Sequence, residues 1–244
     1  MRKLLFSILG LFFIAINLNA QDNSLGTEQV KMLSQYFQKL NPTLYEIKSN
    51  GSFDLKFNTF KGSPYENNKF VVGSVIDGIK KTQSKMYLRY NMYSDEIEIK
   101  TNIYIPKAEA LIKEAGISCI LNNISYYYLG FINEKGTKKY GYLKLVYKGS
   151  NYSLYQRLSS RFIPKEDSHD NSYRQPKPAS FEKKVTYYLK HGNNISFLPT
   201  RKKLLYKNYS EMSNILKSYI KKTHPSLKNK SDLIGLVRFL DTKN

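Results

Sequence analysis

Tyr140–Leu158 reads YGYLKLVYKGSNYSLYQRL. Two alternating runs, Tyr140 to Val146 and Tyr152 to Leu158, lie on either side of the tripeptide Gly149-Ser150-Asn151. Gly, Ser and Asn adopt tight-turn conformations at low cost, and side chains that alternate along a strand point to opposite faces of a sheet. The stretch therefore predicts a β-hairpin, and it sets the fold class for the chain around it.

Hairpins of the same kind recur on both sides of this one. Short β-branched and aromatic runs are separated by turn sequences such as Asp77-Gly78, Ser94-Asp95 and His191-Gly192-Asn193-Asn194. Strands are predicted over Phe53 to Phe57, Phe70 to Ile76, Met86 to Tyr93, Glu96 to Lys100, Ile117 to Leu121, Ser125 to Phe131, Val185 to Leu189 and Ile195 to Leu198. Lys107 to Ala115 is predicted as a helical turn or loop, and the polar stretch Pro164 to Pro178 as a loop or linker.

Near both ends of the chain, the spacing of the apolar residues changes from that of a strand to that of a helix. Apolar residues spaced by three and four predict helices over Thr27 to Leu40, Ser210 to Thr223 and Ser231 to Asp241, with Ser231 as the N-cap of the last one. The fold class predicted is α+β: an antiparallel β-sheet, open or curled into a partly open barrel, built from hairpins, with one N-terminal helix and a C-terminal helical pair.

The first 20 residues have the order of a secretory signal peptide. Arg2 and Lys3 precede an apolar run of about 13 residues, Leu4 to Ile16, and Ala20 is the small residue expected before a cleavage site. The alternative is an uncleaved anchor, for which the run is short because a membrane-spanning helix needs about 20 residues. We therefore expect a signal peptide at 1–20, a β-rich domain with its N-terminal helix at 21–199 and a basic helical segment packed on it at 200–244. We expect an exported protein with no transmembrane segment after cleavage.

The chain is strongly basic. Its 244 residues carry a formal charge of +20, and nine Lys and Arg stand against one acid, Glu211, between Arg201 and Lys230. Such a charge favours anionic partners, although an AT-rich genome would also enrich Lys across the whole chain. Export predicts that nucleic acid is not the partner. Cys119 is the single cysteine, so no intramolecular disulfide and no Cys-based zinc site can form.

Few residues point to catalysis. The three histidines lie in predicted loops and turns without the spacing of a helical metal site, and we expect no metal and no cofactor. A glycosidase-type hydrolase needs two carboxylates that face each other across a cleft. Three carboxylates, Asp95, Glu96 and Glu98, lie close together in the hairpin predicted over Met86 to Lys100. The alternative function is an exported hydrolase with a dispersed site drawn from Asp95, Glu96, Glu98 and His169.

The remaining indication of function is the combination of aromatic and basic residues. Binding sites for sugars, lipid headgroups and single-stranded nucleic acids share this combination. The alternative is that the tyrosines only pack the sheet. Tyr is common in strands, and every second side chain along a strand faces the core. The ligand-binding residues predicted are Tyr87, Arg89, Tyr140, Tyr142, Arg201, Lys202, Lys203, Lys221 and Lys222.

Several short motifs carry a resemblance. Gly62-Ser63-Pro64-Tyr65, Leu88-Arg89-Tyr90-Asn91 with Asp95-Glu96-Ile97-Glu98, Leu154 to Arg157, and Tyr219-Ile220-Lys221-Lys222 resemble, in that order, small exported proteins of Bacteroidota whose function is not characterised. The resemblance implies a two-membrane envelope and a location in the periplasm, at the outer membrane or on the cell surface, so the alternative hydrolase would be periplasmic. It assigns no catalytic residue. The function expected is that of an exported, non-catalytic envelope protein that binds an anionic or saccharide-bearing component or a protein partner.

Overall fold

The structure is a computed structural model that describes residues 45–47, 53–55, 60–166 and 177–243. The chain divides into two units, Met1–Lys56 and Phe57–Asn244. In the first unit, β1 (Tyr45–Ile47) and β2 (Phe53–Leu55) pair as an antiparallel hairpin. The predicted signal peptide at 1–20, the predicted helix Thr27 to Leu40 and residues 167–176 of the predicted polar linker lie outside the described residues.

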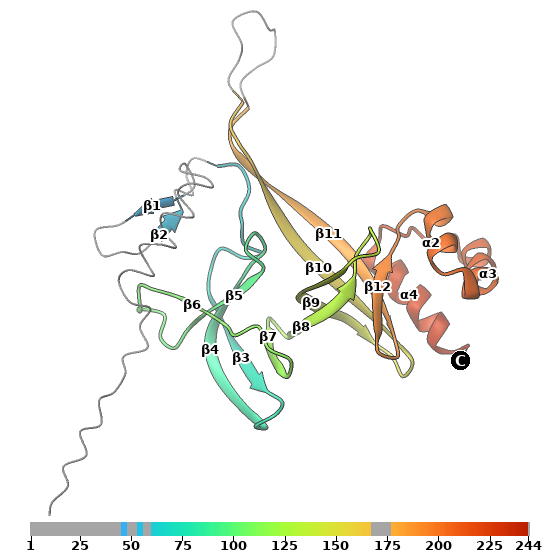
Figure 1. Cartoon of the computed structure of the whole chain (residues 1–244), viewed down its shortest axis with the longest axis horizontal. Coiled ribbons are helices and arrows are strands. Elements are labelled where there is room, and N and C mark those ends of the chain that lie inside the picture. Colours follow the sequence, from blue (N-terminus) through green and yellow to red (C-terminus); the bar gives the residue numbers. More distant parts are fainter. Residues whose placement is uncertain (1–44, 48–52, 56–59, 167–176, 244) are drawn as a thin grey trace, which may run out of the picture. The chain divides into compact units, whose positions relative to one another are not determined.

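The second unit contains a mainly antiparallel sheet of ten strands, followed by helices (Figure 1). Its order is β12-β11-β10-β9-β8-β7-β3-β4-β5-β6, so most neighbours in space are neighbours in sequence. The bounds are β3 (Val71–Asp77), β4 (Thr82–Asn91), β5 (Glu96–Lys100), β6 (Glu109–Ala110), β7 (Ile117–Leu121), β8 (Ile124–Ile132), β9 (Lys138–Lys148), β10 (Tyr152–Ile163), β11 (Ser180–His191) and β12 (Asn194–Leu198). The β-rich, α+β character predicted from the sequence is confirmed, and the hairpin β9–β10 turns at residues 149–151 as predicted.

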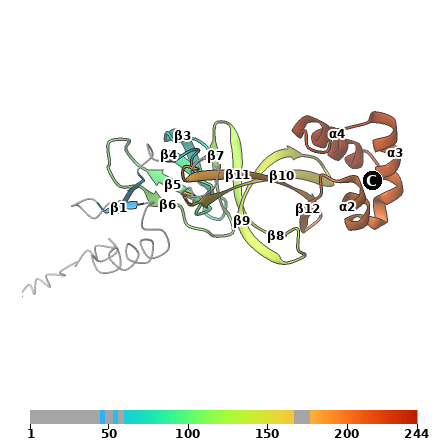
Figure 2. The ribbon, with the colours of Figure 1, turned by 90° about the horizontal axis from the view of Figure 1, so that it is seen from above.

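The last five strands close into a barrel. β12 pairs with β11 on one side and, through Ser196 opposite Ile132, in parallel with β8 on the other. Figure 2 shows β8 and β9 curving round toward β12. A meander of five strands must close with one parallel pair, because strand direction alternates along it. The barrel is therefore closed, where the sequence predicted a sheet that could stay partly open.

β9 and β10 pair next to the turn that joins them and then separate. Their registered pairing ends at Gln156 opposite Lys144, and farther along β10 the amide of Ser160 donates to the carbonyl of Met92, at 3.0 Å. The segment 61–66 runs between β11 and the end of β4, because Lys61 exchanges backbone hydrogen bonds with 179–181 and Met92 donates to Pro64, at 2.7 Å. The far half of β10 thus belongs to a second curved region of the sheet.

Alternate side chains of the strands fill separate cores. Phe131, Leu143, Tyr155, Tyr188 and Ile195 are buried inside the barrel. A second cluster combines side chains of the other strands with side chains from the opposite faces of β8, β9 and β10. It includes Leu88, Tyr90, Met92, Ile97, Leu111, Cys119, Leu121, Tyr126, Tyr142 and Leu158. Cys119 is the buried small hydrophobe that its apolar neighbours in the sequence predict.

The C-terminal segment is helical and covers the outer face of the barrel. It contains α2 (Lys202–Asn208), the short 3-10 helix η2 (Ser210–Met212), α3 (Ser213–Thr223) and α4 (Lys230–Asp241). Leucines from all three α-helices pack on Leu154 and Leu189 of β10 and β11. α3 and α4 are the predicted pair, whereas α2 was not predicted because its seven residues are too few to show a helical period. The cap of α4 is Asn229, which accepts from the amide of Ser231, and not Ser231 itself.

Candidate functional site

Potential metal ligands do not cluster in the part of the chain that the structure describes. Within residues 45–47, 53–55, 60–166 and 177–243, no group of three or more His, Cys, Asp or Glu could hold a metal ion. Over the same residues, no helix is long and apolar enough to cross a membrane. The candidate sites are therefore cavities and charged surfaces.

A cavity of about 610 Å³ lies over β3, β4 and the turn between β7 and β8. We call it the β4 pocket. Its rim is polar, and its wall includes Val71, Leu88, Leu121 and Ile124. At this pocket the carboxylate of Glu66 accepts hydrogen bonds from the hydroxyl of Tyr126 and the ammonium of Lys144. Burial, and then the neighbouring Glu66, raises the pKa of Tyr126 far above its ordinary value, so the phenol stays protonated and donates.

Arg89, one of the predicted ligand-binding residues, is held by the protein itself. Its Nε and Nη2 donate to Glu98 at 2.9 and 2.5 Å, and its Nη1 donates to the carbonyl of Asn68 at 3.0 Å. The guanidinium also lies 3.8 Å from the centre of the Tyr65 ring and 4.3 Å from that of Phe70. These contacts attach loop 63–69 to the sheet. Because the nitrogens of Arg89 already donate to protein acceptors, the role of Arg89 at the β4 pocket is to hold its wall in place and not to bind a ligand.

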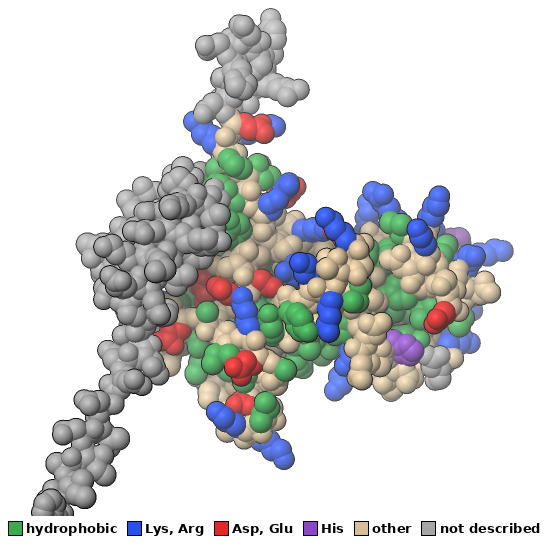
Figure 3. Space-filling view, viewed as in Figure 1, with side chains coloured by type: hydrophobic (Ala, Val, Ile, Leu, Met, Phe, Trp, Pro, Cys, Tyr) green, Lys and Arg blue, Asp and Glu red, His purple; other side chains and the backbone are tan. Residues whose placement is uncertain are grey.

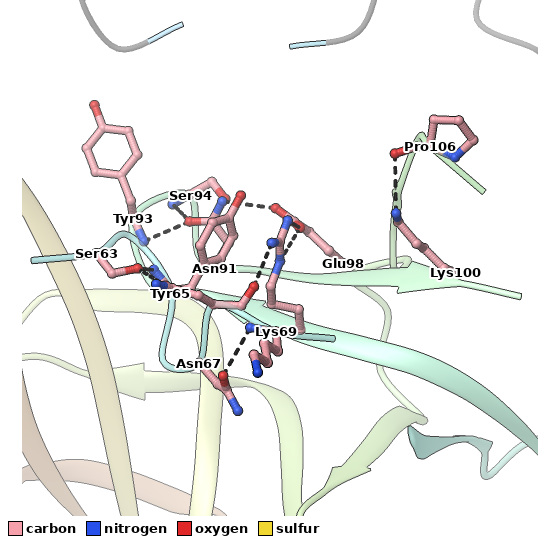
Figure 4. A network of polar contacts seen from close by, with 12 residues as sticks. Ser63, Tyr65, Asn67, Lys69, Asn91, Tyr93, Ser94, Glu98, Lys100 and Pro106 are labelled. Atoms are coloured by element: carbon pink, nitrogen blue, oxygen red, sulfur yellow. Dashed lines mark hydrogen bonds and ion pairs between the residues drawn. The ribbon is translucent and has the colours of Figure 1, made fainter. Parts of the chain in front are cut away.

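Figure 4 shows how this network continues around the loop. The amide of Asn91 donates to Glu98 at 3.2 Å, while its side-chain oxygen accepts from the backbone amides of Tyr93 and Ser94. Lys69 is exposed on the same loop, and its backbone amide donates to Asn67 at 3.0 Å. The turn that follows β4 is thereby fixed by side chains of β4 and β5.

Each of the three carboxylates proposed for a dispersed hydrolase site has its own cation. Asp95 pairs with Arg157 at 3.1 Å, Glu96 with Lys113 at 3.5 Å, and Glu98 with Arg89. His169, the fourth member, lies outside the described residues. No hydrogen bond or ion pair found in the described segments links one of these carboxylates to another.

Asp95 fills the split between β9 and β10. Its Oδ1 accepts from the hydroxyl of Tyr90 at 2.6 Å and from the backbone amide of Tyr142 at 3.4 Å, and its Oδ2 accepts from Arg157. The close approach requires glycine at 141, because a Cβ there would lie 2.4 Å from Oδ2 of Asp95. This carboxylate therefore replaces backbone pairing that the separated strands cannot make.

The predicted tyrosines divide between core and surface. Tyr142 is 1% exposed and belongs to the core, so its ring is not open to a ligand. Tyr87 is half-buried on β4. Tyr140 is 59% exposed and stacks near Tyr128, with ring centres 6.3 Å apart. Of these three, Tyr140 presents the largest surface to solvent.

The remaining predicted residues, Arg201, Lys202, Lys203, Lys221 and Lys222, all lie on α2, on α3 or next to them. They belong to what we call the basic helical surface: the exposed Lys and Arg of residues 201–243. The segment has eleven Lys and Arg against three acids, and all eleven cations are exposed. Figure 3 shows Lys and Arg side chains gathered over this segment with few acids among them.

Acidic side chains do not neutralise the cations of the basic helical surface. Within the described part of the chain, no cation of 201–243 takes part in an ion pair. Two of its three acids accept backbone hydrogen bonds instead: Asp232 from Ser226 at 2.8 Å, and Asp241 from residues 150–152 at 2.7 to 2.9 Å. The positive charge is therefore available to an external partner.

Sequence reasoning missed Glu66, Lys144 and Arg157. Glu66 lies 78 residues from Lys144, and Asp95 lies 62 residues from Arg157. No local pattern marks such pairs, because they form only when the sheet curls. The chain matches no protein-family model, no curated protein and no solved structure.

Proposed function

We propose that this protein is an exported, non-catalytic envelope protein that binds a polyanionic component of the cell envelope through its basic helical surface. The observation that carries the proposal is the set of eleven exposed cations on 201–243 with no ion pair among them in the described chain. The predicted signal peptide at 1–20 supports an envelope location.

The arrangement of the helices favours a surface over a buried pocket. Leu205, Leu216 and Leu236 fix α2, α3 and α4 to the barrel, so the cations lie on elements that are already packed. Ordering the surface on binding then costs little backbone entropy. Each Lys or Arg near an anionic membrane contributes about 1 kcal/mol, and the attraction weakens within a Debye length of about 8 Å at physiological salt.

Co-sedimentation with vesicles tests the proposal. Vesicles of phosphatidylglycerol and phosphatidylcholine are compared with vesicles of phosphatidylcholine alone, and an alginate column represents an acidic polysaccharide. We expect retention on at least one anionic phase, none on the neutral vesicles, and loss of retention with added salt. Retention that persists at about 1 M salt, where the Debye length is about 3 Å, would overturn the electrostatic argument.

A charge-reversal variant locates the surface. Reversing Lys202, Lys203, Lys221 and Lys222 to Glu removes four cations, for which roughly 1 kcal/mol each predicts about a 10³-fold loss of affinity. The matched control reverses four exposed lysines outside the helical segment: Lys85 and Lys183 on strands β4 and β11, and Lys81 and Lys107 in the segments between strands. Equal losses in the two variants would mean that net charge alone drives binding and would refute the assignment to the helices.

A further inference from the structure

A cavity of about 310 Å³ opens at one end of the barrel. We call it the barrel-mouth pocket. Its lining includes the cations Lys135, Lys139, Arg157 and Lys184, the exposed Tyr140 and the buried Tyr188, while Glu134 is the single carboxylate among the lining residues. The volume lies at the lower end of the range of small-molecule pockets, about 300 to 1,000 Å³.

Strand register explains why the cations converge there. Tyr155 opposite Tyr188 belongs to the barrel core, and the next pairs along the same face are Arg157 with Thr186 and Ser159 with Lys184. The core side chains thus give way to polar ones at the point where the barrel ends. Phe131 also lines the pocket, with its ring centre 4.6 Å from that of Tyr188.

The turn that contains Asn133, Glu134 and Lys135 also lines the pocket, and its backbone is fixed by hydrogen bonds. Asn133 accepts through its side chain from the amides of Lys135 and Thr137 at 2.9 and 3.0 Å, and its own amide donates to Thr137. Lys135 is held on this turn, and Lys139 follows it on β9. Both are exposed, and neither takes part in an ion pair in the part of the chain that the structure describes. Their charge is available to a ligand.

Asp95 orients the guanidinium of Arg157 but takes up only part of its hydrogen-bonding capacity. Its Nη2 donates to Asp95 at 3.1 Å and its guanidinium lies 5.7 Å from the centre of the Phe131 ring, whereas its buried Nε has no hydrogen-bond partner among the described residues. Glu134 is already paired with Lys184 at 2.9 Å. Burial raises the pKa of Tyr188 to about 12, so its hydroxyl remains a donor at neutral pH.

We propose that the barrel-mouth pocket binds an oxyanion carried by a sugar, as a sugar phosphate or a uronic acid. Lys135, Lys139 and Arg157 would bind the phosphate or carboxylate, because charge-assisted hydrogen bonds are the strongest that such groups accept. The hydroxyls of Ser159, Thr186 and Tyr188 line the same cavity and match the hydroxyls of a sugar. This site is separate from the basic helical surface and does not depend on it.

Calorimetric titration of the full mature protein tests the site with four probes: glucose 6-phosphate, glucuronate, glucose and inorganic phosphate. We expect binding of at least one of the anionic sugars and none of glucose. Binding of the sugar phosphate alone, or of the uronate alone, identifies which oxyanion the pocket takes. Inorganic phosphate that binds as tightly as the sugar phosphate would overturn the saccharide part of the proposal. Absence of binding by both anionic sugars would overturn all of it.

A double variant, Lys135→Ala with Lys139→Ala, assigns the site. Both lysines are exposed, so the fold should persist, and the loss of two charged contacts predicts roughly 10- to 100-fold weaker binding of the anionic sugar. The matched control is Lys85→Ala with Lys183→Ala, which removes the same charge elsewhere; Lys183 is next to Lys184 on β11 and points to the opposite face. Equal weakening in the two variants would refute the site. The helical charge-reversal variant should bind the sugar normally, which separates this proposal from the previous one.

Discussion

Replacing Asp95 by Asn should destabilise the protein strongly, although the two side chains have the same shape. Asn tolerates the positive φ of 55° at this position better than most residues, so the backbone is preserved. One amide oxygen can still accept from Tyr90 and Tyr142, but the amide nitrogen then faces Nη2 of Arg157, which places two donors together.

The size of the effect follows from burial. The side chains of Arg157 and Asp95 are 25% and 18% exposed, so solvent screens the pair only in part. Hydrogen bonds to charged groups contribute about 1.5 to 3 kcal/mol, and removing one partner of a buried pair costs about 3 to 5 kcal/mol. With allowance for the residual exposure, we expect the free energy of unfolding to fall by about 3 kcal/mol.

An exposed pair of the same chemistry provides the control. Arg161 and Glu182 approach to 2.8 Å, but their side chains are 75% and 60% exposed. Glu182→Gln should therefore cost between about 0 and 1 kcal/mol. Urea unfolding followed by far-UV circular dichroism measures both variants in a chain without tryptophan. A cost for Asp95→Asn below about 0.5 kcal/mol, or one equal to that of Glu182→Gln, would refute the view that Asp95 holds the split strands together.

Three further predictions concern stability and reactivity. Backbone hydrogen bonds, the largest from Tyr152, lower the pKa of Asp241 below its ordinary value of 3.8. The stabilisation is therefore present above that value and lost as the pH falls through the folded-state pKa, so Asp241→Asn should destabilise the protein at pH 7 more than in strong acid; an equal effect at both would contradict this. Cys119 is fully buried and burial raises its pKa to about 12, so a thiol reagent should modify it slowly in the native protein and rapidly in urea, and equal rates would contradict its burial. Leu236→Ala should lower the free energy of unfolding by about 2 to 5 kcal/mol, since Leu236 is fully buried between α4 and the sheet; a loss below about 1 kcal/mol in urea unfolding would show that the helices pack only loosely.

The sequence was informative wherever a pattern repeats over a few residues. Alternation located β5 at Glu96–Lys100 and β7 at Ile117–Leu121, and the three-four spacing located α3 and α4. It was less informative for the site. Arg89 was expected to meet a ligand and is instead bonded to Glu98 and Asn68, because strand pairing places Glu98 directly opposite it.

By itself, then, the sequence determined the hairpins, the helical C-terminal segment and its uncompensated positive charge, since each depends on residues close together in the chain. The tertiary structure alone decided that Ser196 meets Ile132 and closes the barrel. It also decided that Asp95 reaches Arg157, and that four cations converge on the barrel mouth. The physical reason is the same in each case: closure and register arise from the curvature of the whole sheet, which brings distant side chains together and leaves no mark on the local pattern.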